Sequence, residues 1–448
     1  MKILCHAGPW CVKQYQTIAK GVDAEAEVTI TSGFKSVDES SLSADYYENL
    51  RTKASGTISS EEEIEFEDII KRCRLLRSLP RSVAILHVSS MKKAVSDLFD
   101  AVKPDLVISE TIDQFLMDVI YFESLKRGVP FVGLVISFVN GYYRISARGE
   151  YNHLRNVSDN EVQSVIQKLE KSSYKPKFVT QSGSNFKVTV IGRWLKNTLR
   201  VPYFFMKRIL TGEKYNYHYW ASQLTALNNF NFHPKIRFGS KSWKQVVDSS
   251  RKPLVYIPLQ YTPEATIDYW CEDLDVIDYE DRVIDYVEKL TLDFQVLIKE
   301  HPNVIGIRNS SLYRKLSKIE GVVICPVYED SNYIVDLCDA ALVWTGSVGF
   351  EAALRGKPVI TVCNPYYAIG DQFLRLYNNT SSEEILSFIK DRSKGISHEE
   401  KSALVSHVLS GLLPGKYINN ASWDSGNESD IQDAKQIGTH IKKYICRV

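Results

Sequence analysis

Short apolar runs alternate with longer amphipathic segments along most of the chain. Lys2–His6, Asp105–Ser109 and Phe131–Ser137 have the length and composition of buried strands, and helical spacing separates them. Repeated alternation of strand and helix predicts a parallel sheet with helices on both faces. The alternation is lost over residues 138–250 and returns from Leu254 onward.

Two doubly wound, Rossmann-like α/β domains that face a cleft account for this pattern. We expect an N-terminal domain over residues 1–235, which includes a helical insertion at about 138–235. A polar stretch over 236–253 is predicted to be a linker, and a second domain is predicted over 254–425. The last helix, within 426–448, is placed to cross back to the first domain.

Composition narrows the function classes. A net charge of +1 argues against a nucleic-acid binder driven by bulk charge. The eight cysteines form no CxxC pair, and most lie in apolar contexts that favour buried free thiols and a reducing compartment. The N-terminus turns polar too early for a signal peptide, and no apolar stretch reaches the roughly 20 residues that span a bilayer. These features predict a cytoplasmic protein with at most peripheral membrane contact.

The segment from Phe186 to Trp220 mixes basic and aromatic residues. They include Lys187, Arg193, Trp194, Lys196, Arg200, Tyr203, Phe204, Phe205, Lys207 and Arg208. One interpretation is a contact of residues 186–210 with the inner face of the cytoplasmic membrane, or a cradle for an anionic lipid-linked acceptor. The other, which we favour, is a helical hairpin that packs its aromatic side chains into the domain interface, because apolar helical stripes are more often core.

Residues 339–370 contain a strand, a glycine turn, a helix and a second strand. The turn is Thr345-Gly346-Ser347-Val348-Gly349, followed by Glu351 one helical turn later. Glycine lets backbone approach a ligand, and free amides at a helix start favour an anion. The competing interpretation is an ordinary strand-to-helix turn with a capping serine.

Two further motifs follow predicted strands of the second domain. Lys299, Glu300, His301 and Pro302 end one strand, where a lysine and an imidazole can bind a phosphate, although a lone histidine there is usually structural. By the rule that ligands bind at the carboxyl ends of parallel strands, this motif faces the same crevice as the glycine turn.

The sequence PLQYTPE places Gln260 and Glu264 after the neighbouring strand, and Gln260, which can donate and accept hydrogen bonds, is a candidate nucleotide-binding residue. A carboxylate at Glu264 can act as base or nucleophile on a sugar carbon, and a solvated loop acid is the alternative. Glu110 follows a strand of the first domain and is the candidate residue on the acceptor side. The alternative interpretation is again a solvated loop carboxylate. Motifs for a P-loop, an HExxH metal site, a G-x-S-x-G nucleophile elbow and a cysteine zinc site do not occur.

The order PLQ-x-x-x-E, KEHP and TGSVGFEA-x-x-x-GKPV resembles the bacterial capsule polysaccharide biosynthesis proteins that include the β-Kdo transferases. The resemblance covers roughly residues 254–370 and implies a GT-B-type glycosyltransferase in the cytosol. It also implies a CMP-activated sugar in the second domain. His301 and Pro302 would contact the nucleotide, Ser347 and the helix-start amides the phosphate, and Glu351 the ribose.

In the Kdo transferases an aspartate four residues after the glutamine is thought to be the nucleophile of a retaining reaction. Glu264 occupies that position here, and this departure leaves open another acidic sugar or a neutral sugar on UDP. A DxD spacing occurs at Asp273 and Asp275, but in an acidic loop away from the motif strands. We therefore expect no obligatory metal, with Lys299, Ser347 and helix amides carrying the phosphate charge.

The first hypothesis is a glycosyltransferase that acts on a surface polysaccharide or a lipid-linked glycan. A CDP-polyol phosphotransferase of the teichoic-acid type is the second, and it would need His301 as a base. A non-catalytic binding protein of capsule assembly is the third, and a nucleotide-sugar epimerase is a weaker fourth.

Overall fold

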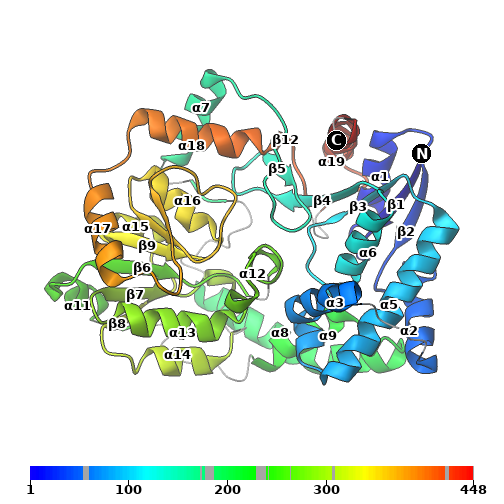
Figure 1. Ribbon diagram of the computed structural model, residues 1–448, viewed down its shortest axis with the longest axis horizontal. Helices are drawn as coiled ribbons and strands as arrows, with labels where there is room; N and C mark the ends of the chain where they lie inside the picture. The colour runs from blue at the N-terminus through cyan, green and yellow to red at the C-terminus, as the bar shows by residue number, and fades with distance from the viewer. Residues whose placement is uncertain are drawn as a thin grey trace. The chain divides into compact units, whose positions relative to one another are not determined.

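The chain forms two compact units that interleave along the sequence. The computed structural model describes residues 1–53, 60–171, 174–176, 186–228, 239–240, 242–262, 264–304, 308–418 and 423–446. Unit 1 comprises Met1–Asn156, Met206–Ala221 and Ser410–Val448, and unit 2 comprises Val157–Phe205 and Ser222–Leu409. Each unit contains one six-stranded sheet with helices around it (Figure 1).

Unit 1 is built on sheet A. Its strands are β1 (Lys2–His6), β2 (Glu27–Thr31), β3 (Leu106–Glu110), β4 (Phe131–Ile136), β5 (Tyr142–Ile145) and β12 (Leu413–Pro414). They lie in the order β12-β5-β4-β3-β1-β2, with β1 to β4 parallel and with β5 and β12 antiparallel to their neighbours. The order changes direction between β1 and β3, which makes this pair a topological switch point.

The helices of unit 1 cover both faces of sheet A. They are α1 (Val12–Val22), α2 (Leu42–Thr52), α3 (Ser60–Arg72), α4 (Arg74–Arg77), α5 (Arg81–Val102), α6 (Phe115–Lys126) and α19 (Glu428–Ile445). Helix α19 packs directly on α1 through Gly21 and Gly438. A Cβ atom at Gly438 would lie 2.2 Å from the carbonyl oxygen of Ile18, so only glycine permits this approach.

Unit 2 is built on sheet B, whose paired strands are all parallel. They are β6 (Leu254–Pro258), β7 (Gln295–Lys299), β8 (Val322–Cys325), β9 (Ala340–Val343), β10 (Val359–Thr361) and β11 (Phe373–Arg375), in the order β11-β10-β9-β6-β7-β8. The apolar runs predicted these strands except β11, because a sheet covered on both faces needs continuous apolar strands. Together with sheet A, sheet B confirms the predicted class of two doubly wound α/β domains.

Helices of unit 2 follow the strands in alternation. They are α7 (Asp159–Leu169), α8 (Phe186–Leu210), α9 (Tyr217–Asn228), α11 (Trp243–Ser249), α12 (Ala265–Asp268), α13 (Tyr279–Leu290), α14 (Ser310–Leu316), α15 (Ser331–Leu337), α16 (Ser347–Leu354), α17 (Ser382–Arg392) and α18 (His398–Ser410), with short 3-10 turns at Leu274–Val276 and Pro302–Val304. The last residues of α8 and the first residues of α9 belong to unit 1. The core includes Trp344, whose indole nitrogen donates to the carbonyl of Val276 at 3.4 Å.

Several features differ from the sequence prediction. Helix α11 lies within the predicted linker 236–253, of which residues 236–238 and 241 fall outside the described residues. Strand β12 joins sheet A by pairing with β5, a contact between distant segments that no local pattern announces. The contact-defined units take Ser410–Val448 into unit 1, whereas the predicted domains were contiguous stretches up to residue 425.

The favoured interpretation of the basic, aromatic segment is wrong for the side chains that the structure describes. Trp194, Tyr203 and Phe205 on α8 are exposed, and only Phe204 of the four singled-out aromatics is buried. The side chains of Lys187 and Arg193 lie outside the described part. Within that part, no helix is both long and apolar enough to cross a membrane.

Candidate functional site

The strand order of sheet B changes direction between β6 and β9. In open α/β sheets, ligands bind outside the carboxyl ends of the strands at such a switch point. Gln260 lies just beyond β6, and Thr345 lies just beyond β9. Two of the motifs selected from the sequence therefore meet at this position, and KEHP follows β7, which is the other neighbour of β6.

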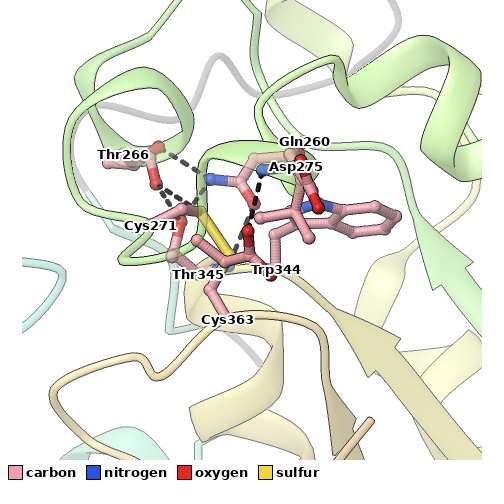
Figure 2. The surroundings of a disulfide bond; sticks show 9 residues. Gln260, Thr266, Cys271, Asp275, Trp344, Thr345 and Cys363 are labelled. Carbon is pink, nitrogen blue, oxygen red and sulfur yellow. Dashed lines mark hydrogen bonds between the residues drawn. A yellow bond between two sulfur atoms is a disulfide. The ribbon is translucent and has the colours of Figure 1, made fainter. Parts of the chain in front are cut away.

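Gln260 joins the two loops through its side-chain amide. Its Nε2 donates to Thr266 Oγ1 at 2.7 Å and to Thr345 Oγ1 at 2.6 Å. Its Oε1 accepts the backbone N–H of Thr345 at 3.2 Å. Both amide protons and the oxygen are thus bonded to the protein, so Gln260 holds the glycine turn in place. The same contacts are visible in Figure 2.

Glu264 lies at the start of the short helix α12. Its side chain is exposed, and its Oε2 accepts a hydrogen bond from Thr266 Oγ1 at 2.7 Å. Because Thr266 also accepts from Gln260, a chain of hydrogen bonds connects Glu264 to the glycine turn. The carboxylate is therefore oriented by the site while remaining open to solvent.

A disulfide bond between Cys271 and Cys363 lies beside these contacts (Figure 2). It ties the segment after α12 to the segment after β10, across a sequence separation of 92 residues. The expectation of free thiols is wrong for this pair, and the inferred reducing compartment loses that support. Five other cysteines are buried and form no disulfide bond, as expected: Cys5, Cys11, Cys73, Cys325 and Cys338.

The glycine turn leads directly into α16. Gly346 precedes the helix, and Ser347, Val348 and Gly349 form its first turn. The buried Tyr367, which the sequence analysis did not select, donates its hydroxyl to the carbonyl of Gly346 at 2.5 Å. A Cβ atom at Gly349 would lie 2.6 Å from that hydroxyl oxygen, so a side chain there would displace the tyrosine. Packing against Tyr367 therefore requires glycine at position 349.

Ser347 and Glu351 form a pair at the start of α16. Ser347 Oγ donates to Glu351 Oε1 at 3.2 Å. Burial raises the pKa of Glu351 to about 7, although the serine hydroxyl and the charge of Arg355 act in the opposite direction. At neutral pH this carboxyl group is therefore poised between its two protonation states.

Lys299 ends β7 with its side chain buried. Its Nζ donates to Ser331 Oγ at 3.0 Å, and burial lowers the pKa of the amine. Charge interactions connect Lys299 to Glu351, whose pKa it lowers. The structure thus brings Lys299, Ser347 and Glu351 into one electrostatic neighbourhood.

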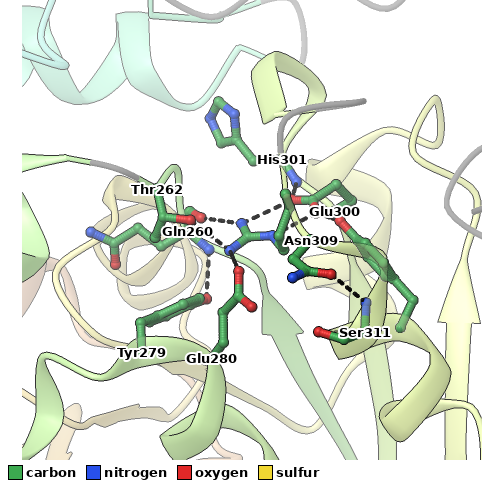
Figure 3. A network of polar contacts seen from close by, with 10 residues as sticks. Gln260, Thr262, Tyr279, Glu280, Glu300, His301, Asn309 and Ser311 are labelled. Atoms are coloured by element: carbon green, nitrogen blue, oxygen red, sulfur yellow. Dashed lines mark hydrogen bonds and ion pairs between the residues drawn. The ribbon is translucent and has the colours of Figure 1, made fainter. Parts of the chain in front are cut away.

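Glu300 of the KEHP motif belongs to a buried ion pair with Arg308 (Figure 3). Arg308 Nε and Nη2 donate to the two carboxylate oxygens at 2.8 and 3.1 Å, and the hydroxyl of Tyr313 also donates to Glu300. Although burial alone would lower it, the pKa of Arg308 is raised by Glu300. A charge pair buried in this way needs every partner satisfied, which makes the network rigid.

The Arg308 network connects the loops after β6 and β7. Arg308 donates to Thr262 Oγ1 at 2.7 Å and to the carbonyl of Gln260 at 2.5 Å. Glu300 accepts the backbone N–H of His301 at 2.6 Å. The sequence analysis missed Arg308, because a single arginine six residues after the motif gives no recognisable signal.

His301 points away from this network in Figure 3. Its Nδ1 accepts the backbone N–H of Asn303 at 3.2 Å, so a neutral ring carries its proton on Nε2. The ring of Tyr261 packs edge-on against it at 5.7 Å between centroids. Pro302 begins the 3-10 turn that follows. In its neutral form the imidazole is therefore a hydrogen-bond donor at Nε2, on the loop after β7.

Glu110 lies at the switch point of sheet A in unit 1. It ends β3, and burial together with the charge of Asp113 raises its pKa to about 8. On the neighbouring strand the buried His6 has a pKa lowered to about 4 by burial, and its Nδ1 lies 3.5 Å from Ser109 Oγ. Unit 1 thus also gathers polar groups at the carboxyl edge of its sheet.

Asp273 and Asp275 have the DxD spacing, but the sequence analysis did not expect them to bind a metal. Asp273 Oδ1 accepts the backbone N–H of Asp275 at 2.8 Å, which is a local helix-capping contact. Among the residues that the structure describes, no group of three or more His, Cys, Asp or Glu side chains is arranged to hold a metal ion.

The chain is thus a protein of two doubly wound α/β units, the second with its motifs gathered at the switch point of its sheet. Residues 200–371 match the family described as capsule polysaccharide biosynthesis protein. This stretch contains the PLQ, KEHP and glycine-turn motifs, so the family resemblance predicted from them is confirmed there. No curated protein matches the sequence significantly.

The solved structures to which this chain is similar include those of two transferases and an epimerase. The KpsC β-Kdo 2,7 transferase of Thermosulfurimonas dismutans is 13% identical with a TM-score of 0.39, and the similarity covers 99% of this chain and 100% of that one. The β-Kdo 2,4 transferase of the same KpsC is 9% identical with a TM-score of 0.33, over 68% and 79% of the two chains. The UDP-GlcNAc 2-epimerase of Methanocaldococcus jannaschii, solved with UDP-GlcNAc and UDP, is 11% identical with a TM-score of 0.30, over 92% and 99%. TM-scores this low support no conclusion about activity.

Proposed function

We propose that the protein is a glycosyltransferase that moves a sugar from a nucleotide-activated donor to a surface-polysaccharide or lipid-linked glycan acceptor. The observation that carries the proposal is the joining of the β6 and β9 loops by Gln260 and Thr345 at the switch point of sheet B. The match of residues 200–371 to a capsule biosynthesis family supports the same function.

The donor phosphate binds at the start of α16 in this proposal. The first amides of a helix have no partner within it and favour an anion, and Ser347 adds a hydroxyl. Lys299 supplies positive charge, and Glu351 accepts hydrogen bonds from the ribose. Val348 and Gly349 keep the backbone close to the phosphate. No metal is assigned to this site.

His301 donates its Nε2 proton to the nucleotide, with Pro302 shaping the loop. A CDP-polyol phosphotransferase would instead need Nε2 unprotonated as a base. That tautomer carries its proton on Nδ1, and it is disfavoured because Nδ1 accepts the N–H of Asn303. We therefore prefer a glycosyltransferase. The favoured donor is CMP-Kdo or a related CMP-activated acidic sugar, and a UDP-sugar is the alternative.

Glu264 is the proposed nucleophile. Its carboxylate attacks the anomeric carbon, the bond from that carbon to the donor phosphate oxygen breaks, and the nucleoside monophosphate leaves with the bonding electrons. An acceptor hydroxyl then displaces the glutamate and gives its proton to a base. Glu110, at the carboxyl edge of sheet A, remains the candidate residue on the acceptor side.

The test of this reaction uses CMP-Kdo and three forms of the protein: wild type, Glu264→Gln and Glu264→Asp. Wild type should release CMP and carry the sugar covalently on the peptide that contains Glu264, as read by mass spectrometry. Glu264→Gln should lower CMP release at least about 100-fold while still binding CMP. Unchanged release by Glu264→Gln would exclude the assigned nucleophile.

A further inference from the structure

Helix α8 turns a row of apolar side chains to solvent. Leu195, Leu199, Tyr203, Met206 and Leu210 are 54, 64, 55, 51 and 75% exposed. They follow one another at intervals of three or four residues, which places them on one side of a helix. We call these five residues the apolar face of α8. The exposed Phe205 and Ile209 extend it on one side.

The opposite side of the helix packs against the protein. Asn197 and Phe204, seven residues apart, are only 2% and 7% exposed. The guanidinium of Arg200 lies 5.3 Å from the centroid of the Phe204 ring. The helix is therefore seated on the protein by one side, and its apolar face is the side left open.

Basic residues border the apolar face on one flank. Lys196, Arg200 and Lys207 each follow a residue of the face by one position, so they share a strip between the open and the seated sides. Over its 25 residues α8 has six lysines and arginines and no acidic residue. The charge of the helix is thus uniformly positive.

A bilayer surface fits this combination. Exposed apolar patches of this extent mark interaction sites, and an apolar stripe beside lysines and arginines suits the boundary between headgroups and acyl chains. Anionic headgroups neutralise the basic flank, and a tyrosine on the face prefers the same depth. A contact between two copies of α8 would instead bring positive charge against positive charge, with no acid on the helix to neutralise it.

We propose that α8 docks the protein on a membrane surface rich in anionic phospholipids, with its apolar face in the headgroup boundary and its basic flank on the phosphates. The docking does not depend on the proposed transfer reaction. It adds to that reaction the place where the protein would meet a lipid-linked acceptor.

The test is flotation of the full chain with phosphatidylcholine vesicles that contain either no phosphatidylglycerol or about one third of it. Wild type should bind the anionic vesicles and be released by salt. Reversing the flank in Lys196→Glu, Arg200→Glu and Lys207→Glu together should weaken binding by at least roughly 100-fold. Leu199→Ser, Phe205→Ser and Leu210→Ser together should do the same, and these exposed side chains leave the fold intact.

Matched controls lie elsewhere on the surface. Lys126→Glu, Lys318→Glu and Lys394→Glu change the net charge equally at exposed positions, and Ile64→Ser, Leu125→Ser and Leu292→Ser remove equally exposed apolar side chains. Both control triples should bind vesicles like wild type.

Three results would overturn the proposal. The first is that wild type binds neutral vesicles as well as anionic ones. The second is that the control triples lose as much binding as the α8 variants. The third is that wild type does not bind vesicles but forms a dimer in sedimentation, which the apolar variant dissociates. Thermal stabilisation by CMP, measured on the same variants, separates this outcome from failure of the proposed function. The α8 variants should respond to CMP like wild type, whatever the vesicles show.

Discussion

Gln260 holds the candidate site together through hydrogen bonds of its side-chain amide to two neighbouring threonines. Its amide makes three hydrogen bonds to Thr266 and Thr345, so it acts as a brace for the glycine turn. The sequence analysis assigned it to the nucleotide. The structure adds that its side chain holds the turn in position.

Gln260→Met should remove that brace with little change in volume. The N–H of Thr345 would lose its buried partner, so we expect the free energy of unfolding to fall by about 1–3 kcal/mol. Nucleotide affinity should also weaken, because the turn is no longer held. Urea unfolding measures the first effect. Gln432→Met on the exposed side of α19 is the control, and an equal effect there would contradict the assigned role.

Glu351 should make stability depend on pH. Folding raises its pKa from 4.5 to about 7, so the folded chain holds this proton more tightly than the unfolded chain does. As pH rises through this window, deprotonation costs the folded state, and the free energy of unfolding falls. Relative to Glu351→Gln, wild type should lose on the order of 1–3 kcal/mol between pH 4.5 and 8.

Urea unfolding of both proteins at several pH values isolates the contribution of Glu351, because other titrating groups are common to both. Glu320→Gln at an exposed position serves as the matched variant and should show no such difference. A constant gap between wild type and Glu351→Gln across the range would argue against the raised pKa.

At the scale of elements, the Cys271–Cys363 disulfide ties the segment after α12 to the segment after β10. Closing a loop of 92 residues restricts the unfolded chain strongly. Replacing both cysteines by alanine should lower the free energy of unfolding by roughly 2–5 kcal/mol. Reductant should destabilise wild type and have no further effect on the double variant.

The exposed thiol of Cys446 provides the control for this experiment. Cys446→Ala should unfold like wild type and keep its sensitivity to reductant. If reductant left wild type unchanged, the bond would not contribute to stability in solution.

Local sequence pattern predicted most strands of sheet B, because they are short apolar runs. Strand β11 was not predicted, since its three residues include an arginine and are only partly buried. The strand order that brings Gln260 beside Thr345 came from the structure. The pairing of β12 with β5 could not be predicted, since β12 has only two residues and joins segments far apart in the chain.

The amphipathic spacing of α8 indicated which residues share one side of the helix, but it did not indicate which side faces solvent. The favoured interpretation placed all four aromatic residues in the domain interface, whereas only Phe204 among them is buried, together with the polar Asn197. Similarly, Arg308 reaches back to Gln260 from a separate segment, and the two bonded cysteines carry no spacing signal. These contacts depend on tertiary packing, which a periodic pattern does not encode.

For the whole molecule, each unit gathers polar groups at its own switch point. In unit 2 these are the loops around Gln260, His301 and Ser347, and in unit 1 they are His6 and Glu110. The proposed function assigns the donor to unit 2 and the acceptor to unit 1. Its central claim is that unit 2 binds an activated sugar through its nucleotide.

The most direct test of this claim is thermal unfolding with CMP, CDP, UDP and GDP, using wild type, His301→Ala and the exposed control His153→Ala. A ligand at a hundred times its dissociation constant adds about 2.7 kcal/mol to the stability. We predict that CMP stabilises wild type and His153→Ala most, and that His301→Ala loses this response. If UDP stabilises the protein most, the donor would be a UDP-sugar instead of a CMP-sugar. If CDP does so, the phosphotransferase would be favoured. Absence of stabilisation by any nucleotide would contradict the account.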